Sequence, residues 1–112
     1  MKLNDLVQLP GFSLLVEGVD LNREVKGLKC SDLLSWVMAN AGDGDVWVTV
    51  QTHMNIVAVA ALLEMACIIA PEGIEMEVGT LEKAKEQNVA ILSADTDAFG
   101  IFSRLYEAGL RQ

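Results

Sequence analysis

Several residue types that mark particular protein classes are scarce in this chain. Its 112 residues include two cysteines, two prolines and one histidine, and aromatic residues make up only 5%. Two cysteines without CxxC spacing, Cys30 and Cys67, do not form a disulfide framework, and one histidine does not complete a structural zinc site. We expect both cysteines to be small buried side chains in a reducing compartment. We expect no metal and no cofactor.

Basic residues and long apolar runs are scarce as well. Eight Lys and Arg stand against 16 Asp and Glu, which gives a net charge of −8. Such a chain repels a phosphate backbone and has no polybasic anchor, so nucleic acid and membrane surfaces are excluded as partners. The longest apolar stretch, residues 56–70, is interrupted by Glu64 and falls short of the ~20 residues of a membrane span. We expect a cytoplasmic protein.

Apolar residues are plentiful, at 52%, and they fall into short segments separated by helical patterns. Length and composition predict one domain covering residues 1–112. Strands joined by helices favour parallel pairing with right-handed crossovers, while the early connections are too short for a crossover throughout. The predicted fold is a three-layer α/β/α sandwich on a mixed, mostly parallel five-stranded sheet. The expected strands are residues 12–16, 24–30, 46–50, 67–70 and 89–92. The expected helices are residues 2–8, 31–40, 52–66, 80–87 and a last one that begins at residue 95 or 96.

The helix predicted over residues 52–66 is apolar nearly all round, which is typical of a helix covered on both sides. Its outer cover is expected to be a further helix of the chain or a partner subunit. Side chains that suit helix starts are Ser31, Thr52, and Asp95 or Thr96. Asp32 would favour the dipole of its helix. Phe99, Phe102, Leu105 and Tyr106 are the expected inward stripe of the last helix.

A ligand site is expected where the parallel strands end, because open α/β sheets bind ligands outside the carboxyl ends of their strands. Three predicted loops meet there, at residues 51–55, 71–73 and 93–97. Each of their polar residues has a structural alternative: helix capping, solvation, or a positive φ at Gly73. The candidate ligand-binding residues are Thr52, His53, Asn55, Gly73, Ser93, Asp95 and Thr96.

The chain resembles the DRTGG domain family over most of its length, and the small stand-alone members in particular. The resemblance is carried by Ser31-Asp32-Leu33-Leu34, by residues 48–57 (Val-Thr-Val-Gln-Thr-His-Met-Asn-Ile-Val), by residues 80–84 (Thr-Leu-Glu-Lys-Ala) and by Ile91-Leu92-Ser93. It implies an α/β/α domain like the N-terminal domain of HPr kinase. It further implies a non-catalytic regulatory or ligand-sensing role and a homodimer. Some stand-alone members are associated with iron-hydrogenase proteins.

The family's signature is incomplete here. Thr52 stands at the family's first Asp, His53 at its Arg and Asn55 at its second Asp, while the Thr-Gly-Gly falls at residues 71–73 and keeps only Gly73. This departure disfavours an anionic ligand, since a histidine is a pH-sensitive substitute for a guanidinium.

Three functions remain open. The first is a homodimeric regulatory module that senses a small ligand, such as a nucleotide or phosphate, at the strand ends. The second is an assembly module that docks to a larger enzyme, such as an iron-hydrogenase component, and has no ligand of its own. The third is a small enzyme using His53 or an acid at the strand ends. The sequence has no GxSxG, Walker A or GxGxxG pattern, so we do not expect an enzyme.

Overall fold

The computed structural model describes residues 1–112, which form one five-stranded sheet in the order β1-β5-β4-β3-β2. Strands β2 to β5 are parallel neighbours, and β1 pairs antiparallel with β5, so the sheet is mixed and mostly parallel as predicted. The strands are β1 (Phe12–Leu14), β2 (Gly27–Cys30), β3 (Asp45–Val48), β4 (Cys67–Ala70) and β5 (Ile91–Ala94).

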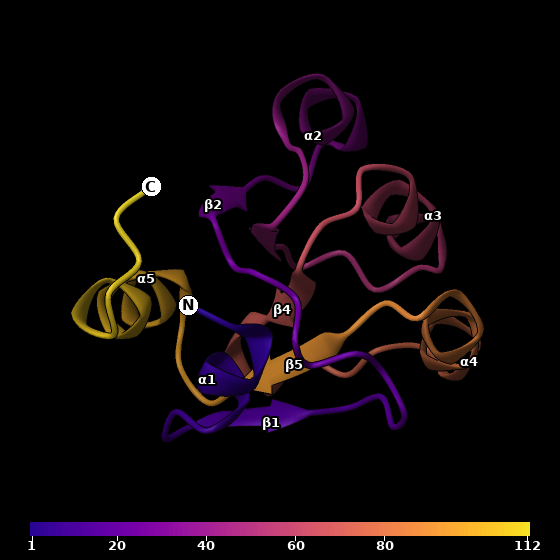
Figure 1. The fold of residues 1–112 in the computed structure, drawn as a ribbon. Coiled ribbons are helices and arrows are strands. Elements are labelled where there is room, and N and C mark those ends of the chain that lie inside the picture. Colours follow the sequence, from indigo (N-terminus) through magenta and orange to yellow (C-terminus); the bar gives the residue numbers. More distant parts are fainter.

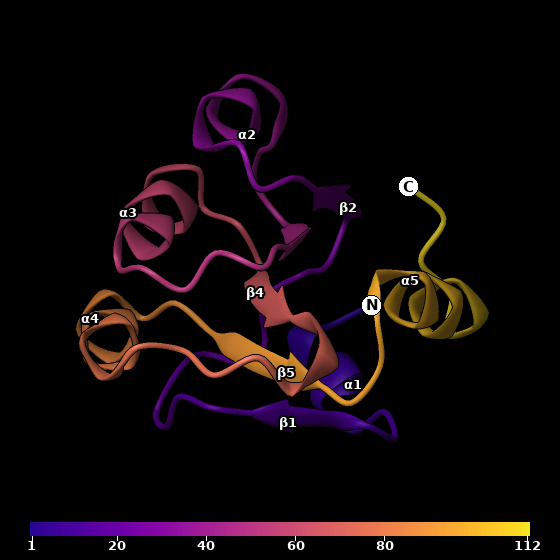
Figure 2. The same ribbon diagram turned by 180° about the vertical axis from the view of Figure 1, so that it is seen from behind.

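The helices cover both faces of this sheet, and this confirms the three-layer sandwich. Three of them lie side by side on one face, and two lie on the other (Figures 1 and 2). The first group is α2 (Leu34–Asn40), α3 (Asn55–Leu62) and α4 (Val78–Gln87). The second is α1 (Leu3–Val7) and α5 (Ala98–Glu107), and a 3-10 turn (Pro71–Gly73) follows β4. None of the helices combines the length and apolarity that crossing a bilayer requires.

Alternation along the strands divides the core into two clusters. Val46, Val48 and Leu92 pack toward α1 and α5, whereas Trp47 and Ile68 pack toward α2, α3 and α4. Successive strand side chains point to opposite faces, so a sheet covered on both faces needs an apolar residue at every position. This is why β4 and the last three residues of β3, Val46 to Val48, are continuous apolar runs that the sequence predicts readily.

Several predicted helix ends are wrong, because their polar groups have other partners. The hydroxyl of Ser31 accepts the N–H of Leu33 at 3.1 Å, ahead of the helix, and α2 begins only at Leu34 without a side-chain cap. Thr52 does not cap α3, which begins at Asn55. The last helix is capped neither by Asp95 nor by Thr96. Asp97 caps it by accepting the N–H of Gly100 at 2.9 Å.

The exposure of individual side chains contradicts two further predictions. Cys67 is buried as predicted, but Cys30 is exposed, since it ends the edge strand β2. On α5 the fully buried side chains are Ile101 and Leu105, while Phe99 and Tyr106 are 77% and 60% exposed. The helix begins at Ala98, and Ile101 and Leu105 lie on the side that faces the sheet. The predicted inward stripe did not include Ile101.

The α3 helix is shorter than predicted and lies between two neighbours. It ends at Leu62, and Glu64 adopts a left-handed φ of 56° where the chain turns back toward β4. Helices α2 and α4 flank α3 (Figure 1), but the outer side of α3 is open. Leu62, on that side, is 68% exposed. Helices of the same chain therefore lie on both sides of α3, but none covers its outer side.

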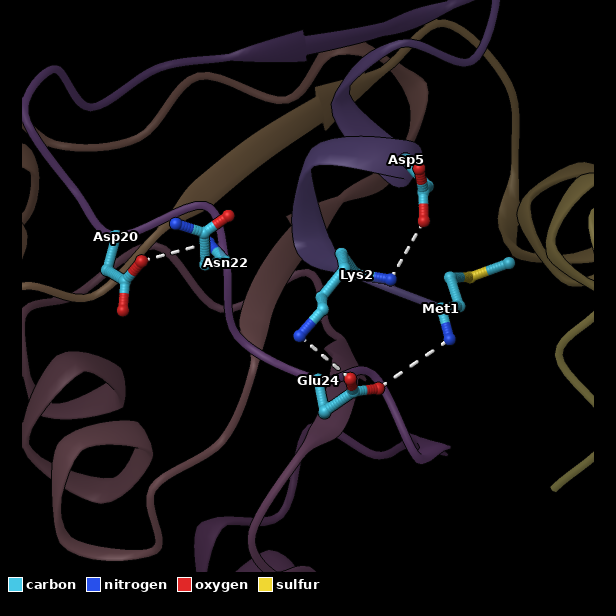
Figure 3. Close-up of polar contacts among 6 residues, drawn as sticks. All are labelled: Met1, Lys2, Asp5, Asp20, Asn22 and Glu24. Carbon is cyan, nitrogen blue, oxygen red and sulfur yellow. Dashed lines mark hydrogen bonds and ion pairs between the residues drawn. The ribbon is translucent and has the colours of Figure 1, made fainter.

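The N-terminal residues Met1 and Lys2 form ion pairs with Glu24, which precedes β2, and Lys2 is hydrogen-bonded to Asp5 (Figure 3). The Lys2 ammonium pairs with Glu24 at 2.9 Å, and the terminal amine of Met1 lies 3.7 Å from the same carboxylate. The hydrogen bond and charge of Lys2 lower the pKa of Glu24. Asp5 accepts the N–H of Lys2 at 2.8 Å and so holds the start of α1, whose Leu3 and Leu6 are buried.

Candidate functional site

The strand-end rim is the edge of the sheet where β2 to β5 finish, and its first part is organised by Asp32. The Asp32 carboxylate accepts the hydroxyl of Thr49 at 2.8 Å and the N–H of Val50 at 2.9 Å. The side-chain amide of Gln51 donates to the Asp32 carbonyl at 2.9 Å. The loop after β2 is thus tied to the loop after β3. Sequence reasoning assigned Asp32 to the helix dipole and missed this contact, because a side chain 17 residues away supplies it.

Thr52, His53 and Asn55 form the next part of the rim, and Thr52 contacts the start of α4. The carbonyl of Thr52 accepts the hydroxyl of Thr80 at 2.6 Å, and the Thr52 hydroxyl lies 3.4 Å from a carboxylate oxygen of Glu77. His53 is exposed, and its Nδ1 accepts the N–H of Asn55 at 3.2 Å. Thr80 is almost fully buried, so this group holds the β3–α3 loop against α4.

Gly73 and Ser93 lie together at a hollow of about 280 Å³ between the end of β4, β5 and α4. Its remaining lining residues are Leu15, Ile74, Glu75, Met76 and Leu81. Gly73 has φ 64°, as predicted, and Glu72 beside it has φ 58°. The N–H of Glu72 donates to the carbonyl of Thr96 at 2.8 Å, which connects the third predicted loop to this part of the rim.

Asp95 is separated from the other candidates. Its carboxylate pairs with Arg104 at 2.7 Å, and the two residues line a different hollow of about 420 Å³ beside Gly11 and Glu107. The same guanidinium lies 6.0 Å from the ring centroid of Phe12. The structure therefore places the seven predicted residues in three groups. Only Gly73 and Ser93 share a hollow.

The rim is acidic and has no free cation. Its loops, residues 31–33, 49–55, 71–77 and 93–97, contain no Lys or Arg. Their acids are Asp32, Glu72, Glu75, Glu77, Asp95 and Asp97. No three His, Cys, Asp or Glu side chains gather closely enough to hold a metal ion. Of the two thiols, burial raises the pKa of Cys67 to about 12, and burial together with the Asp32 charge raises that of Cys30.

No family model and no curated protein matches the sequence. A solved structure is similar: the CBS and DRTGG domains of the regulatory region of Clostridium perfringens pyrophosphatase, complexed with the activator diadenosine tetraphosphate. The likeness has a TM-score of 0.74 at 14% identity and covers 92% of this chain. The chain spans 45% of that structure. At this identity the likeness concerns the fold, and it supports the DRTGG-like fold that the sequence resemblance implied.

Proposed function

We propose that this chain is a non-catalytic regulatory module that binds a small molecule at the strand-end rim. The observation that carries the proposal is the hollow shared by Gly73 and Ser93. It lies where open α/β sheets bind ligands, at the carboxyl ends of neighbouring strands β4 and β5. The fold likeness to a pyrophosphatase regulatory region bound to a nucleotide activator supports the regulatory assignment.

The lining of the hollow favours a nucleobase or nucleoside over a phosphate group. Leu15, Ile74, Met76 and Leu81 provide apolar walls, and Ser93 provides a hydroxyl. The single charge in the lining is Glu75, which repels an anion. A volume of about 280 Å³ suits one small ring system, because sites for drug-sized ligands start near ~300 Å³. We therefore propose a flat, neutral ligand, or the nucleoside part of a nucleotide whose phosphates stay in solvent.

Thermal unfolding tests this proposal with adenosine, guanosine, AMP, diadenosine tetraphosphate and inorganic phosphate as probes. A ligand present at a hundredfold its Kd adds ~2.7 kcal/mol to the free energy of unfolding, which raises the Tm of a chain this size by several degrees. We expect a nucleoside to raise the Tm and phosphate to leave it unchanged. Ser93→Phe, which fills the hollow, should abolish the shift, whereas Thr52→Ala should preserve it. A Tm that no probe changes, or a ligand-induced Tm shift that is unchanged in Ser93→Phe, contradicts the proposal.

A second candidate function, assembly, is favoured by a different observation. Phe99, Phe102 and Tyr106 form a stripe on α5, and the outer two rings are largely exposed. Aromatic side chains of this kind are enriched at protein interfaces. Glu107 lines a hollow with Phe102 and Tyr106, and the guanidinium of Arg111 lies 3.9 Å from the ring centroid of Tyr106, so this surface carries both signs of charge within a chain of net charge −8.

We propose this stripe as the contact of a homodimer, because two acidic copies approach best where their own charges balance. In this reading the dimer, with or without a bound nucleoside, is the form that docks to a larger enzyme such as an iron-hydrogenase component. Sedimentation velocity should show a dimer that Phe99→Ser weakens. An unchanged dimer in Phe99→Ser would place the contact elsewhere.

A further inference from the structure

Two of the three helices in one outer layer carry no charge at all. Helices α2 and α3 have the sequences LSWVMAN and NIVAVAAL, and neither contains Asp, Glu, Lys or Arg. Helix α4 lies in the same layer and has Glu82, Lys83, Lys85 and Glu86. A helix that faces solvent on one side normally places charged residues there, as α4 does. The outer sides of α2 and α3 therefore differ from an ordinary solvated surface.

Large apolar side chains are exposed on these two helices and at their first turns. Leu33, Trp36 and Met38 are 62%, 41% and 49% exposed, and Met54 and Leu62 are 43% and 68% exposed. Helices α2 and α3 pack side by side (Figures 1 and 2). Trp36 and Met38 are two residues apart and therefore point to different sides of α2. The name α2–α3 surface is used here for Met38, Met54 and Leu62 together with the uncharged outer sides of the two helices. Exposed apolar side chains on uncharged helix faces are typical of interaction sites, and two of these three are methionines, whose flexible side chains adapt to a partner.

The charges that border the α2–α3 surface at the strand ends are negative. Asp32 precedes α2, and Glu77 precedes α4 and contacts the loop before α3. Neither carboxylate forms an ion pair, while Asp43, at the opposite end of α2, already pairs with Lys26. A second copy of this chain seated here would bring uncompensated acids close to one another. An apolar occupant with basic flanking residues matches the border instead.

We propose that the α2–α3 surface docks an amphipathic helical segment of another protein, apolar on one side and rich in Lys and Arg beside it. The apolar side would cover Leu62 and Met54, and the basic residues would lie near Asp32 and Glu77. Such helix-on-surface recognition uses anchors at i, i+3 or i+4 and i+7 spacing. The site is separate from the Gly73–Ser93 hollow, so failure of ligand binding leaves this inference intact.

The test uses the full chain and fluorescence anisotropy with a labelled synthetic helix of leucine and lysine in amphipathic order. A peptide of the same composition in scrambled order measures nonspecific attraction to the acidic protein. We expect the amphipathic peptide to bind at least ten times more tightly than the scrambled one. Leu62→Ser should remove that difference, whereas Val78→Ser, at a 72% exposed position on α4, should preserve it. Met38→Ser provides a second variant on the proposed surface.

Three results would overturn the proposal. One is equal affinity for the amphipathic and scrambled peptides. Another is an affinity difference that both Leu62→Ser and Met38→Ser leave unchanged, in proteins whose Tm shows that they are folded. The third is a homodimer in sedimentation that Leu62→Ser dissociates, since the occupant would then be a second copy. Selective loss of amphipathic-peptide binding in folded Leu62→Ser, with its oligomeric state unchanged, supports the docking site.

Discussion

Replacing Asp32 by alanine should destabilise the protein well beyond the loss expected for a surface acid. In Asp32→Ala, the hydroxyl of Thr49 loses its acceptor, and Thr49 is only 1% exposed. A buried polar group left without a partner costs about 1–3 kcal/mol. The N–H of Val50 belongs to an exposed residue, so water replaces its lost bond. We expect the free energy of unfolding to fall by about 2 kcal/mol. At about 2.1 cal/mol/K of unfolding entropy per residue, this lowers the Tm by roughly 8 °C.

Urea unfolding followed by circular dichroism measures this loss, and a double-mutant cycle isolates its cause. In a Thr49→Val background no buried hydroxyl remains, so Asp32→Ala should then cost less than about 1 kcal/mol. Asp20→Ala is the matched control: this exposed carboxylate accepts one backbone N–H, from Asn22, and should cost under about 1 kcal/mol. The reasoning is refuted if Asp32→Ala costs no more than Asp20→Ala, or if its cost is the same with and without the Thr49 hydroxyl.

Three further predictions concern single positions. Val59→Asp should prevent folding, because Val59 is 7% exposed, whereas Leu62→Asp should leave the circular dichroism spectrum unchanged; equal damage from both would contradict the assigned burial of α3. At pH 8 iodoacetamide should label only Cys30 in the native protein and both cysteines in urea, because full burial and a pKa of about 12 suppress the thiolate of Cys67. Mass spectrometry counts the adducts, and a native protein labelled twice would refute this prediction. Glu72→Gly should raise the free energy of unfolding by about 0.5–1 kcal/mol, since a left-handed φ strains any residue with a Cβ, and calorimetry showing a loss would contradict that account.

The sequence predicts the layers of this fold better than it predicts the helix ends. The strand at Cys67–Ala70 matches the expected range, because an apolar run between two helical patterns has few alternatives. The helix caps fail for a common reason. Asp32 and Thr52 have side chains that suit a helix start, but the Asp32 carboxylate accepts the hydroxyl of Thr49 and the Thr52 hydroxyl lies 3.4 Å from a carboxylate oxygen of Glu77, and both partners are distant in sequence. Local patterns do not report such partners.

The positions of the three candidate loops were predicted correctly, but the way their residues are grouped was not. The loops do lie along the carboxyl ends of the strands, as the parallel topology requires. Their side chains diverge because each loop bonds to a different neighbour: Thr52 to α4, and Asp95 to Arg104 on α5. The apolar lining from Leu15 and Met76 was missed, since these residues lie outside the three loops and read as ordinary core.

The antiparallel pairing of β1 with β5 has a kinetic consequence. Each parallel pair joins strands that follow one another in the chain, but Phe12 meets Ala94 across roughly eighty residues. Contacts of such long sequence separation require a large loop to close, and they slow folding. Until β1 arrives, β5 presents a bare strand edge to other molecules, which is a template for intermolecular pairing. Closure of this edge requires the longest chain loop of any strand pair in the sheet. Changes that weaken β1 should therefore show first as aggregation during refolding, before any change appears in the native core.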